Sequence, residues 1–200
     1  MGFYMAKSNK GSTTKLSTIQ RVFLYSLIGS LGVAALVAII MFLFGKFGSV
    51  ELKTLATTLF VSAYSIISLG SLAVYSRKQY RPVALSGVAL SVVAFAMTMF
   101  LIWGGEMGLE YWRVATVTGI LAFSTAHSSL LLLARSKDTV VNTFVTATIF
   151  FVAIVASMMI YSELSGWGSV GETFYRFLGV AVVLDVLGTI VTPILKKVRS

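Results

Sequence analysis

The sequence predicts an all-α integral membrane protein, a bundle of six transmembrane helices. Hydrophobic residues make up 57% of the 200-residue chain and charged residues only 12%, whereas soluble domains average about 45–50% and about 25%. So few charges could not cover an apolar core with a polar shell, so the bilayer is the natural solvent. The apolar residues fall into six continuous runs of helix-spanning length, and none alternates with the period of two that strands require.

The chain divides into a basic amino-terminal tail over 1–21, a six-helix transmembrane domain over 22–195 and a basic carboxy-terminal tail over 196–200. The expected spans are about 22–45, 54–75, 82–103, 112–134, 139–162 and 174–195. The first run follows a polar, basic segment, as in a signal peptide, but it is too long for an ordinary signal-peptide core and has no evident cleavage site. We therefore expect it to remain as the first helix.

Small residues recur in several spans at spacings that bring helices close together. The first span carries Ser26, Ser30, Ala34 and Ala38 at every fourth position, which predicts a packing ridge on one face. Lipid tails are as apolar as leucine, so membrane helices associate through close packing and hydrogen bonds. These residues predict a tight bundle or a surface that docks against another membrane subunit.

The basic residues orient the chain. Twelve of the sixteen Lys and Arg lie in the two tails and in the loops after the second and fourth spans. Because cytoplasmic loops carry an excess of Lys and Arg, both termini are expected in the cytoplasm, in a plasma or inner membrane. This distribution also accounts for the net charge of +9, so no nucleic-acid partner is expected. The lipid bilayer is the first expected partner.

Each even-numbered span begins with an acid followed by a base. The expected outer-end ion pairs are Glu110 with Arg113 and Glu172 with Arg176, at helical spacings of three and four residues. Residues 51–78 also match residues 110–137 at seven positions when they are superposed. Two explanations stay open for this similarity: three sequential helical hairpins that repeat one unit, or convergent chemistry at the outer interface.

Asp185 and His127 are the two residues that suggest chemistry. A carboxylate at mid-bilayer costs about 2.5–3.5 kcal/mol on insertion scales and usually faces the bundle interior. Counted from the basic ends of their spans, Asp185 and the single histidine, His127, differ in depth by roughly one helical turn. Three roles remain open: a hydrogen-bonded interhelical tie, a proton relay or coupling site, or a contact with a partner subunit or a lipid headgroup.

The chain lacks most of the residues that metal sites, catalytic triads and haem ligation require. The chain has no cysteine and one histidine, so no metal site is expected and a triad or metal hydrolase is disfavoured. His127 could ligate a haem or pigment, but a bis-histidine haem would need a second histidine, so no cofactor is predicted. No catalytic motif is present, and an enzyme is not expected.

The sequence therefore predicts a non-catalytic, multi-pass membrane protein. The expected function is a small accessory or scaffold subunit that packs against a membrane-protein partner or forms a homo-oligomer. The alternative is a small proton-coupled transporter or permease that uses Asp185, either alone or with His127.

Overall fold

A computed structural model describes residues 18–44, 48–105, 107–166 and 169–199 of the chain. Over these residues the chain is entirely helical and contains no strand. The helices are α1 (Thr18–Phe44), α2 (Ser49–Leu72), α3 (Arg81–Trp103), α4 (Leu109–Leu133), α5 (Thr139–Ser165) and α6 (Glu172–Arg199), and a short 3-10 helix, η1 (Lys78–Tyr80), precedes α3. All six are long and apolar enough to span a membrane. The predicted all-helical chain with six membrane-length helices is therefore confirmed, while the expected amino-terminal tail lies outside the described residues up to position 17.

Most helices extend beyond the apolar runs of the sequence. The clearest case is α6, which was expected over 174–195 and continues to Arg199. Its last turn carries Lys196, Lys197 and Arg199, and cations are stabilising next to the partial negative charge of a helix C-terminus. Pro193, expected near a helix end, consequently lies inside α6.

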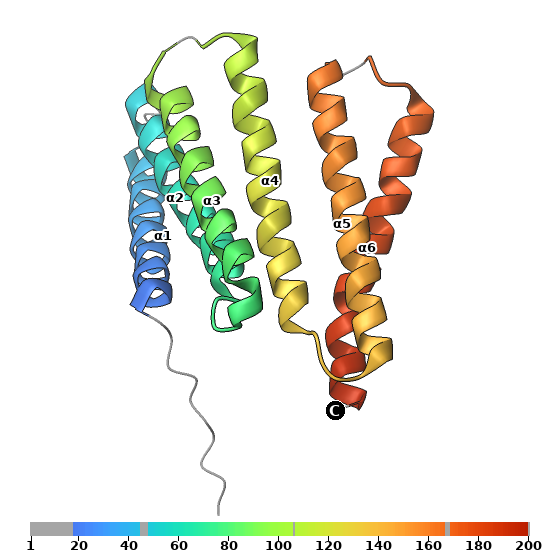
Figure 1. Cartoon of the computed structure of the whole chain (residues 1–200). Coiled ribbons are helices and arrows are strands. Elements are labelled where there is room, and N and C mark those ends of the chain that lie inside the picture. The colour runs from blue at the N-terminus through green and yellow to red at the C-terminus, as the bar shows by residue number, and fades with distance from the viewer. Residues whose placement is uncertain (1–17, 45–47, 106, 167–168, 200) are drawn as a thin grey trace, which may run out of the picture.

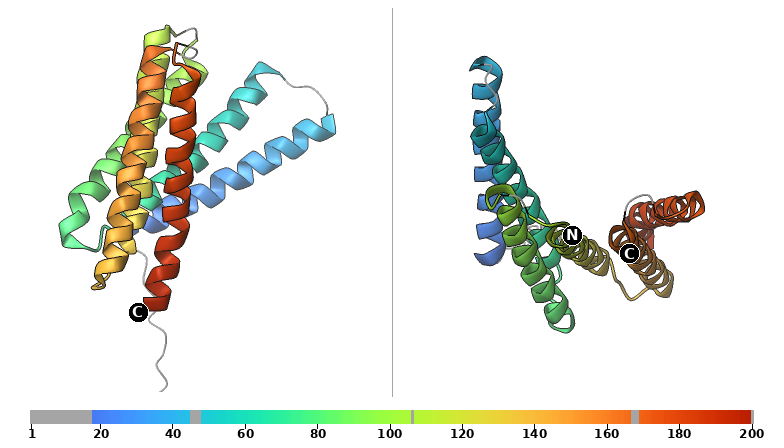
Figure 2. Two further views of the ribbon diagram at one scale, coloured as in Figure 1. Left: turned by 90° about the vertical axis from the view of Figure 1, so that its right-hand side faces the viewer. Right: turned by 90° about the horizontal axis from the view of Figure 1, so that it is seen from above.

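The helices pack in a connected series. Helix α1 packs against α2, α2 and α3 pack against each other and against α4, and α5 packs against both α4 and α6. Seen along the helices, α4 lies between the α1–α3 group and the α5–α6 pair (Figure 2). Thr18 begins α1 at the same end of the assembly at which α6 ends (Figure 1).

Small and hydroxyl-bearing residues form the contacts between helices. On α2, four buried serines recur at every third position, namely Ser62, Ser65, Ser68 and Ser71. At Gly87 of α3 an added Cβ would lie 2.7 Å from the Ser71 Cβ and 3.0 Å from a Thr125 methyl group, so the helices meet there almost backbone to backbone. Close approach of this kind supplies the van der Waals contact that holds membrane helices together.

The C-terminal end of α4 is tied to two other segments by cations. The Arg77 guanidinium donates to the Leu132 and Leu133 carbonyls over 3.1 and 3.2 Å, and the Lys196 ammonium donates to the Leu133 carbonyl over 3.1 Å. The last four carbonyls of a helix have no donor within it. Arg77 and Lys196 supply such donors and fix this end of α4 against α6 and the α2–α3 connection.

Candidate functional site

Asp185 lies on the inward face of α6. Its residue surface is 8% exposed, whereas Val186 and Leu187 next to it are 49% and 52% exposed. Ala181 and Thr192, one turn before and two turns after Asp185, are buried on the same face. Asp185 is the only buried acidic or basic residue among the described ones, and an acid within an apolar helix is costly to insert into a membrane.

His127 on α4 faces Asp185 across the helix boundary. Its Nε2 lies 3.8 Å from Asp185 Oδ1, and both side chains are largely buried. The Phe123 ring, one turn earlier on α4, stands edge-on to the imidazole with 6.1 Å between ring centroids. The structure thus brings together the two residues that the sequence singled out.

Thr189 of α6, which the sequence did not single out, joins the two side chains. His127 Nε2 lies 2.9 Å from Thr189 Oγ1, and the Thr189 hydroxyl donates to Asp185 Oδ1 over 3.5 Å. A hydroxyl has one hydrogen and two lone pairs. With its hydrogen directed at Asp185, it can accept a hydrogen bond from a protonated Nε2, which gives a continuous chain from imidazole to carboxylate.

Two cavities meet at this cluster. A cavity of about 280 Å³ lies among α4, α5 and α6, and its lining includes Gly119, Met159 and Asp185. A second cavity of about 420 Å³ lies among α2, α4 and α6, and its lining includes Gly70 and Thr189. Phe123 and His127 line both.

The two cavities lie toward opposite ends of the bundle. The first reaches toward the start of α4 and the end of α5, at Gly119 and Met159. The second reaches toward the end of α4 and the last turns of α6, at Ala134 and Pro193. We call them the outer and the inner cavity, according to the orientation predicted from the basic residues. The His127–Thr189–Asp185 cluster therefore lies at the junction between two separate hollows.

Pro193 changes the backbone beside the cluster. Proline has no N–H, so the Thr189 carbonyl loses the donor that position 193 would otherwise supply. Thr189 and Pro193 both line the inner cavity. This stretch of α6 thus offers a backbone acceptor next to the polar side chains.

A close helix–helix contact sets the position of α6. A Cβ added at Gly188 would overlap the Thr148 side chain of α5, with the Thr148 Cβ 3.0 Å away. Thr148 is buried and donates its hydroxyl to the Phe144 carbonyl over 2.8 Å. Because Gly188 precedes Thr189 directly, this contact fixes the distance at which the cluster residues of α6 stand from the bundle.

The structure also places the expected packing ridge of the first helix. Ala34 is buried, Ser30 and Ala38 are half-buried, and Ser26 is exposed. Ser30 Oγ lies 2.5 Å from Ser62 Oγ of α2. The hydroxyl of Ser30 thus forms a direct polar contact between α1 and α2.

Both expected outer-end pairs have ion-pair distances. Arg113 Nη1 lies 3.0 Å from Glu110 Oε1, and Arg176 Nη2 lies 2.8 Å from Glu172 Oε1. The side chains of Glu172 and Arg176 are 81% and 75% exposed. Exposed pairs of this kind contribute about 0–1 kcal/mol to stability, and neither pair reaches the cavities.

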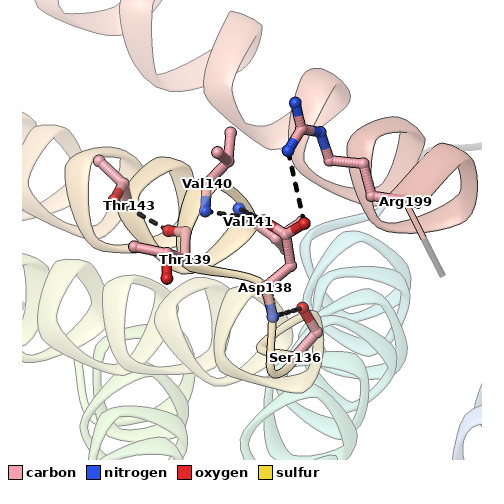
Figure 3. A network of polar contacts seen from close by, with 7 residues as sticks. All are labelled: Ser136, Asp138, Thr139, Val140, Val141, Thr143 and Arg199. Carbon is pink, nitrogen blue, oxygen red and sulfur yellow. Dashed lines mark hydrogen bonds and ion pairs between the residues drawn. The ribbon is translucent and has the colours of Figure 1, made fainter.

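Sequence reasoning also passed over Asp138, the N-cap of α5. Its Oδ1 accepts from the Val141 and Val140 amides over 3.2 and 2.7 Å, and its Oδ2 lies 3.4 Å from Arg199 Nη1 at the end of α6 (Figure 3). The Val141 amide lowers the pKa of the Asp138 carboxyl most, and the Val140 amide and Arg199 lower it further against the opposing effect of desolvation. An Asp directly before a helical run is a known N-cap signal, so the N-cap of α5 could have been predicted from the sequence.

The cluster holds one imidazole, one hydroxyl and one carboxylate as potential ligands of a metal ion. Within the described ranges, no group of three or more His, Asp or Glu side chains comes together.

No protein-family model, no curated protein and no solved structure matches this chain.

Proposed function

We propose that this chain is a small proton-coupled membrane transporter whose proton-binding site is the His127–Thr189–Asp185 cluster. The observation that supports it is the shared position of this cluster, at the junction of an outer and an inner cavity. Transporter sites commonly lie near the bilayer midplane, where helices with interrupted backbone hydrogen bonding contribute carbonyl groups. The carbonyl released by Pro193 is of this kind.

The cluster can pass a proton without moving a heavy atom far. Imidazolium Nε2 gives its proton to Thr189 Oγ1 while the Thr189 hydroxyl gives its own proton to Asp185, leaving neutral imidazole and a carboxylic acid. Histidine ordinarily exchanges protons near neutral pH. A proton that enters from one cavity at His127 could in this way be held at Asp185, which lines the outer cavity.

We further infer that both termini lie in the cytoplasm, in a plasma or inner membrane, and that the chain enters and leaves the bilayer as three helical hairpins. The bias of twelve Lys and Arg toward one end supports this orientation. Packing of α1 with α2, α3 with α4 and α5 with α6 is compatible with the three hairpins.

A proteoliposome assay tests the proton-coupled function. The full-length chain is reconstituted around a pH-sensitive dye, and an outward potassium gradient with valinomycin drives protons inward. We expect the wild-type chain to acidify the lumen faster than Asp185→Asn, with Glu172→Gln as a matched control at an exposed carboxylate. Equal rates in the wild type and Asp185→Asn would overturn the proposal.

A second candidate function is the accessory or scaffold subunit, and one surface favours it. A groove of about 440 Å³ lies among α3, α4 and α5, and its lining includes five hydroxyl side chains, those of Ser86, Ser124, Thr125, Ser128 and Ser157. Hydroxyls in a groove at membrane depth are suited to hydrogen bonds with another helix. Purification of the tagged chain from its native membrane in mild detergent, with mass spectrometry, distinguishes the two functions: a stable larger assembly supports the subunit, and a small oligomer of this chain alone contradicts it.

A further inference from the structure

The walls of the outer cavity restrict what it can bind. They are apolar apart from Ser124, His127 and Asp185. Among the residues that the structure describes, no Lys or Arg lines either cavity, and Asp185 is the one acid that does so. An anion would therefore meet a carboxylate and no cationic partner, and a sugar would find few of the polar groups that position its hydroxyls.

A metal ion is equally unsuited to this site. Calcium takes six to eight oxygen ligands, and magnesium requires nearly ideal octahedral coordination. The outer cavity offers one carboxylate and one serine hydroxyl from its walls. A positive charge bound here must instead belong to a ligand whose own apolar groups fill the remaining space.

We propose that the outer cavity binds a lipophilic organic cation, such as a substituted ammonium, at Asp185, and that this cation exchanges for the proton of the cluster. The inference rests on the proposed transport function and names its substrate class. Asp185 supplies the counter-charge, and Phe123, which lines both cavities, supplies an aromatic ring that attracts cations. Apolar side chains such as Ile120, Val155 and Met159 suit the hydrocarbon groups of the ligand.

Charge balance makes the proton and the cation mutually exclusive. With one proton on Asp185 and a neutral imidazole, the cluster carries no net charge. When that proton leaves, the O–H bond breaks and the electron pair stays on the carboxylate. A bound cation then restores neutrality. In a low-dielectric interior, either an uncompensated carboxylate or an extra positive charge is costly. Binding of one organic cation should thus release about one proton, while in the absence of the cation the cluster still carries protons alone down a membrane potential.

Few other ionisable groups could disturb this exchange. His127 from α4 and Asp185 from α6 are the titratable residues that line the two cavities, and α2 and α5 contribute none to either lining. The charged residues Arg77, Arg135 and Lys196 are engaged by carbonyl or hydroxyl groups at the inner ends of the helices. The proton released on binding should therefore come from the cluster.

Calorimetry with benzyltrimethylammonium tests the proposal. The purified full-length chain in a neutral detergent is titrated with this cation in two buffers of different ionisation enthalpy, which gives the number of protons released. Neopentylbenzene, in which carbon replaces the nitrogen, is the neutral control. We expect release of about one proton for each bound cation and at least about tenfold weaker binding of the neutral compound, which gains nothing from a counter-charge.

The wild-type chain supplies a second readout that does not depend on the folding of a variant. If a proton and the cation exclude each other, the dissociation constant should rise by about tenfold for each pH unit on the acidic side of the cluster's titration. Asp185→Asn should abolish both proton release and this pH dependence, while Glu172→Gln should preserve them.

The possible results test the substrate class separately from the proton-coupled function on which it rests. Absence of binding, or equal binding of the cation and its neutral analogue, overturns the substrate class. If Asp185-dependent proton flux persists in proteoliposomes, the proton-coupled function still stands. Cation binding without proton release, and with an affinity independent of pH, overturns the exchange.

Discussion

Gly188 of α6 packs against Thr148 of α5 so closely that a single added methyl group would overlap the threonine side chain. This contact lies one residue from Thr189 and therefore controls where the candidate site stands relative to α4. Overfilling a packed contact typically costs about 1–3 kcal/mol. We expect Gly188→Ala to lower the thermal stability of the protein in detergent and to reduce proton flux.

Gly179→Ala is the matched control for this substitution. Gly179 lies on the same helix, and a Cβ added there would meet nothing within 4 Å. Because alanine favours helices by about 0.5–1 kcal/mol over glycine, we expect unchanged or slightly higher stability. Equal effects of the two substitutions would contradict the close α5–α6 contact.

The Thr189 hydroxyl is expected to carry protons between His127 and Asp185. Thr189→Val removes the hydroxyl at nearly constant volume, whereas Thr189→Ser keeps it. We expect Thr189→Val to slow proton flux in proteoliposomes by about tenfold or more, since general acid–base groups contribute factors of this size or larger. Thr189→Ser should retain most of the flux, and a serine variant as slow as the valine variant would argue against the relay.

Asp185 can be tested for ionisation separately from hydrogen bonding. Asp185→Asn retains hydrogen-bonding capacity, and Asp185→Leu removes it along with the charge. If ionisation is the function, both variants should fold and both should lose proton flux. If Asn preserves flux and expression while Leu does not, Asp185 is an interhelical tie instead, a role worth about 1–2 kcal/mol or less.

Asp138 gives a pH dependence with a defined sign. Its pKa in the folded state is lowered from 3.8, chiefly by the Val141 amide. The ionised carboxylate therefore stabilises the fold above that ordinary value, and this contribution is lost as the pH falls through the lowered pKa. Asp138→Asn keeps an N-cap acceptor but loses the charge that favours a helix N-terminus.

We accordingly expect Asp138→Asn to melt at a lower temperature than the wild type at about pH 6, and the difference to shrink toward about pH 3. Thermal unfolding in detergent, followed by circular dichroism, measures it. A difference that stays constant over this range would mean that the charge of Asp138 does not contribute.

Orientation in the membrane can be measured directly because the chain contains no cysteine. Single cysteines at Lys137 and Ser169, both exposed and at opposite ends of α5, are labelled in intact cells with a membrane-impermeant maleimide. If both termini are cytoplasmic, Ser169→Cys should react and Lys137→Cys should react only after permeabilisation. The reverse pattern would invert the topology.

The sequence predicted the helical class and the number of spans, because each span is one continuous apolar run and a hydropathy profile along the chain shows such runs directly. Helix ends were predicted less well, since α6 continues through Pro193 and its terminal cations to Arg199. Favourable charges at a helix C-terminus and continued backbone hydrogen bonding extend a helix past its apolar run. Hydropathy does not detect either effect.

Only two of the three residues of the candidate site could be predicted from the sequence. Asp185 and His127 stood out because ionisable residues are rare in membrane spans. Thr189 did not, because threonines are common in these helices and most of them donate to their own backbone, as Thr148 and Thr192 do. The position of Thr189 between two other side chains depends on how α4 and α6 are rotated.

The sequence by itself determined the class of fold, the six apolar helices, and the presence of one acid and one histidine within the expected spans. Only the tertiary structure decided that these two side chains meet through Thr189 and stand between two cavities. The physical reason is that lipid and protein interior are equally apolar, so hydrophobic periodicity does not fix which face of a membrane helix turns inward. That choice comes from contacts between helices, such as Gly188 against Thr148 and Ser30 against Ser62.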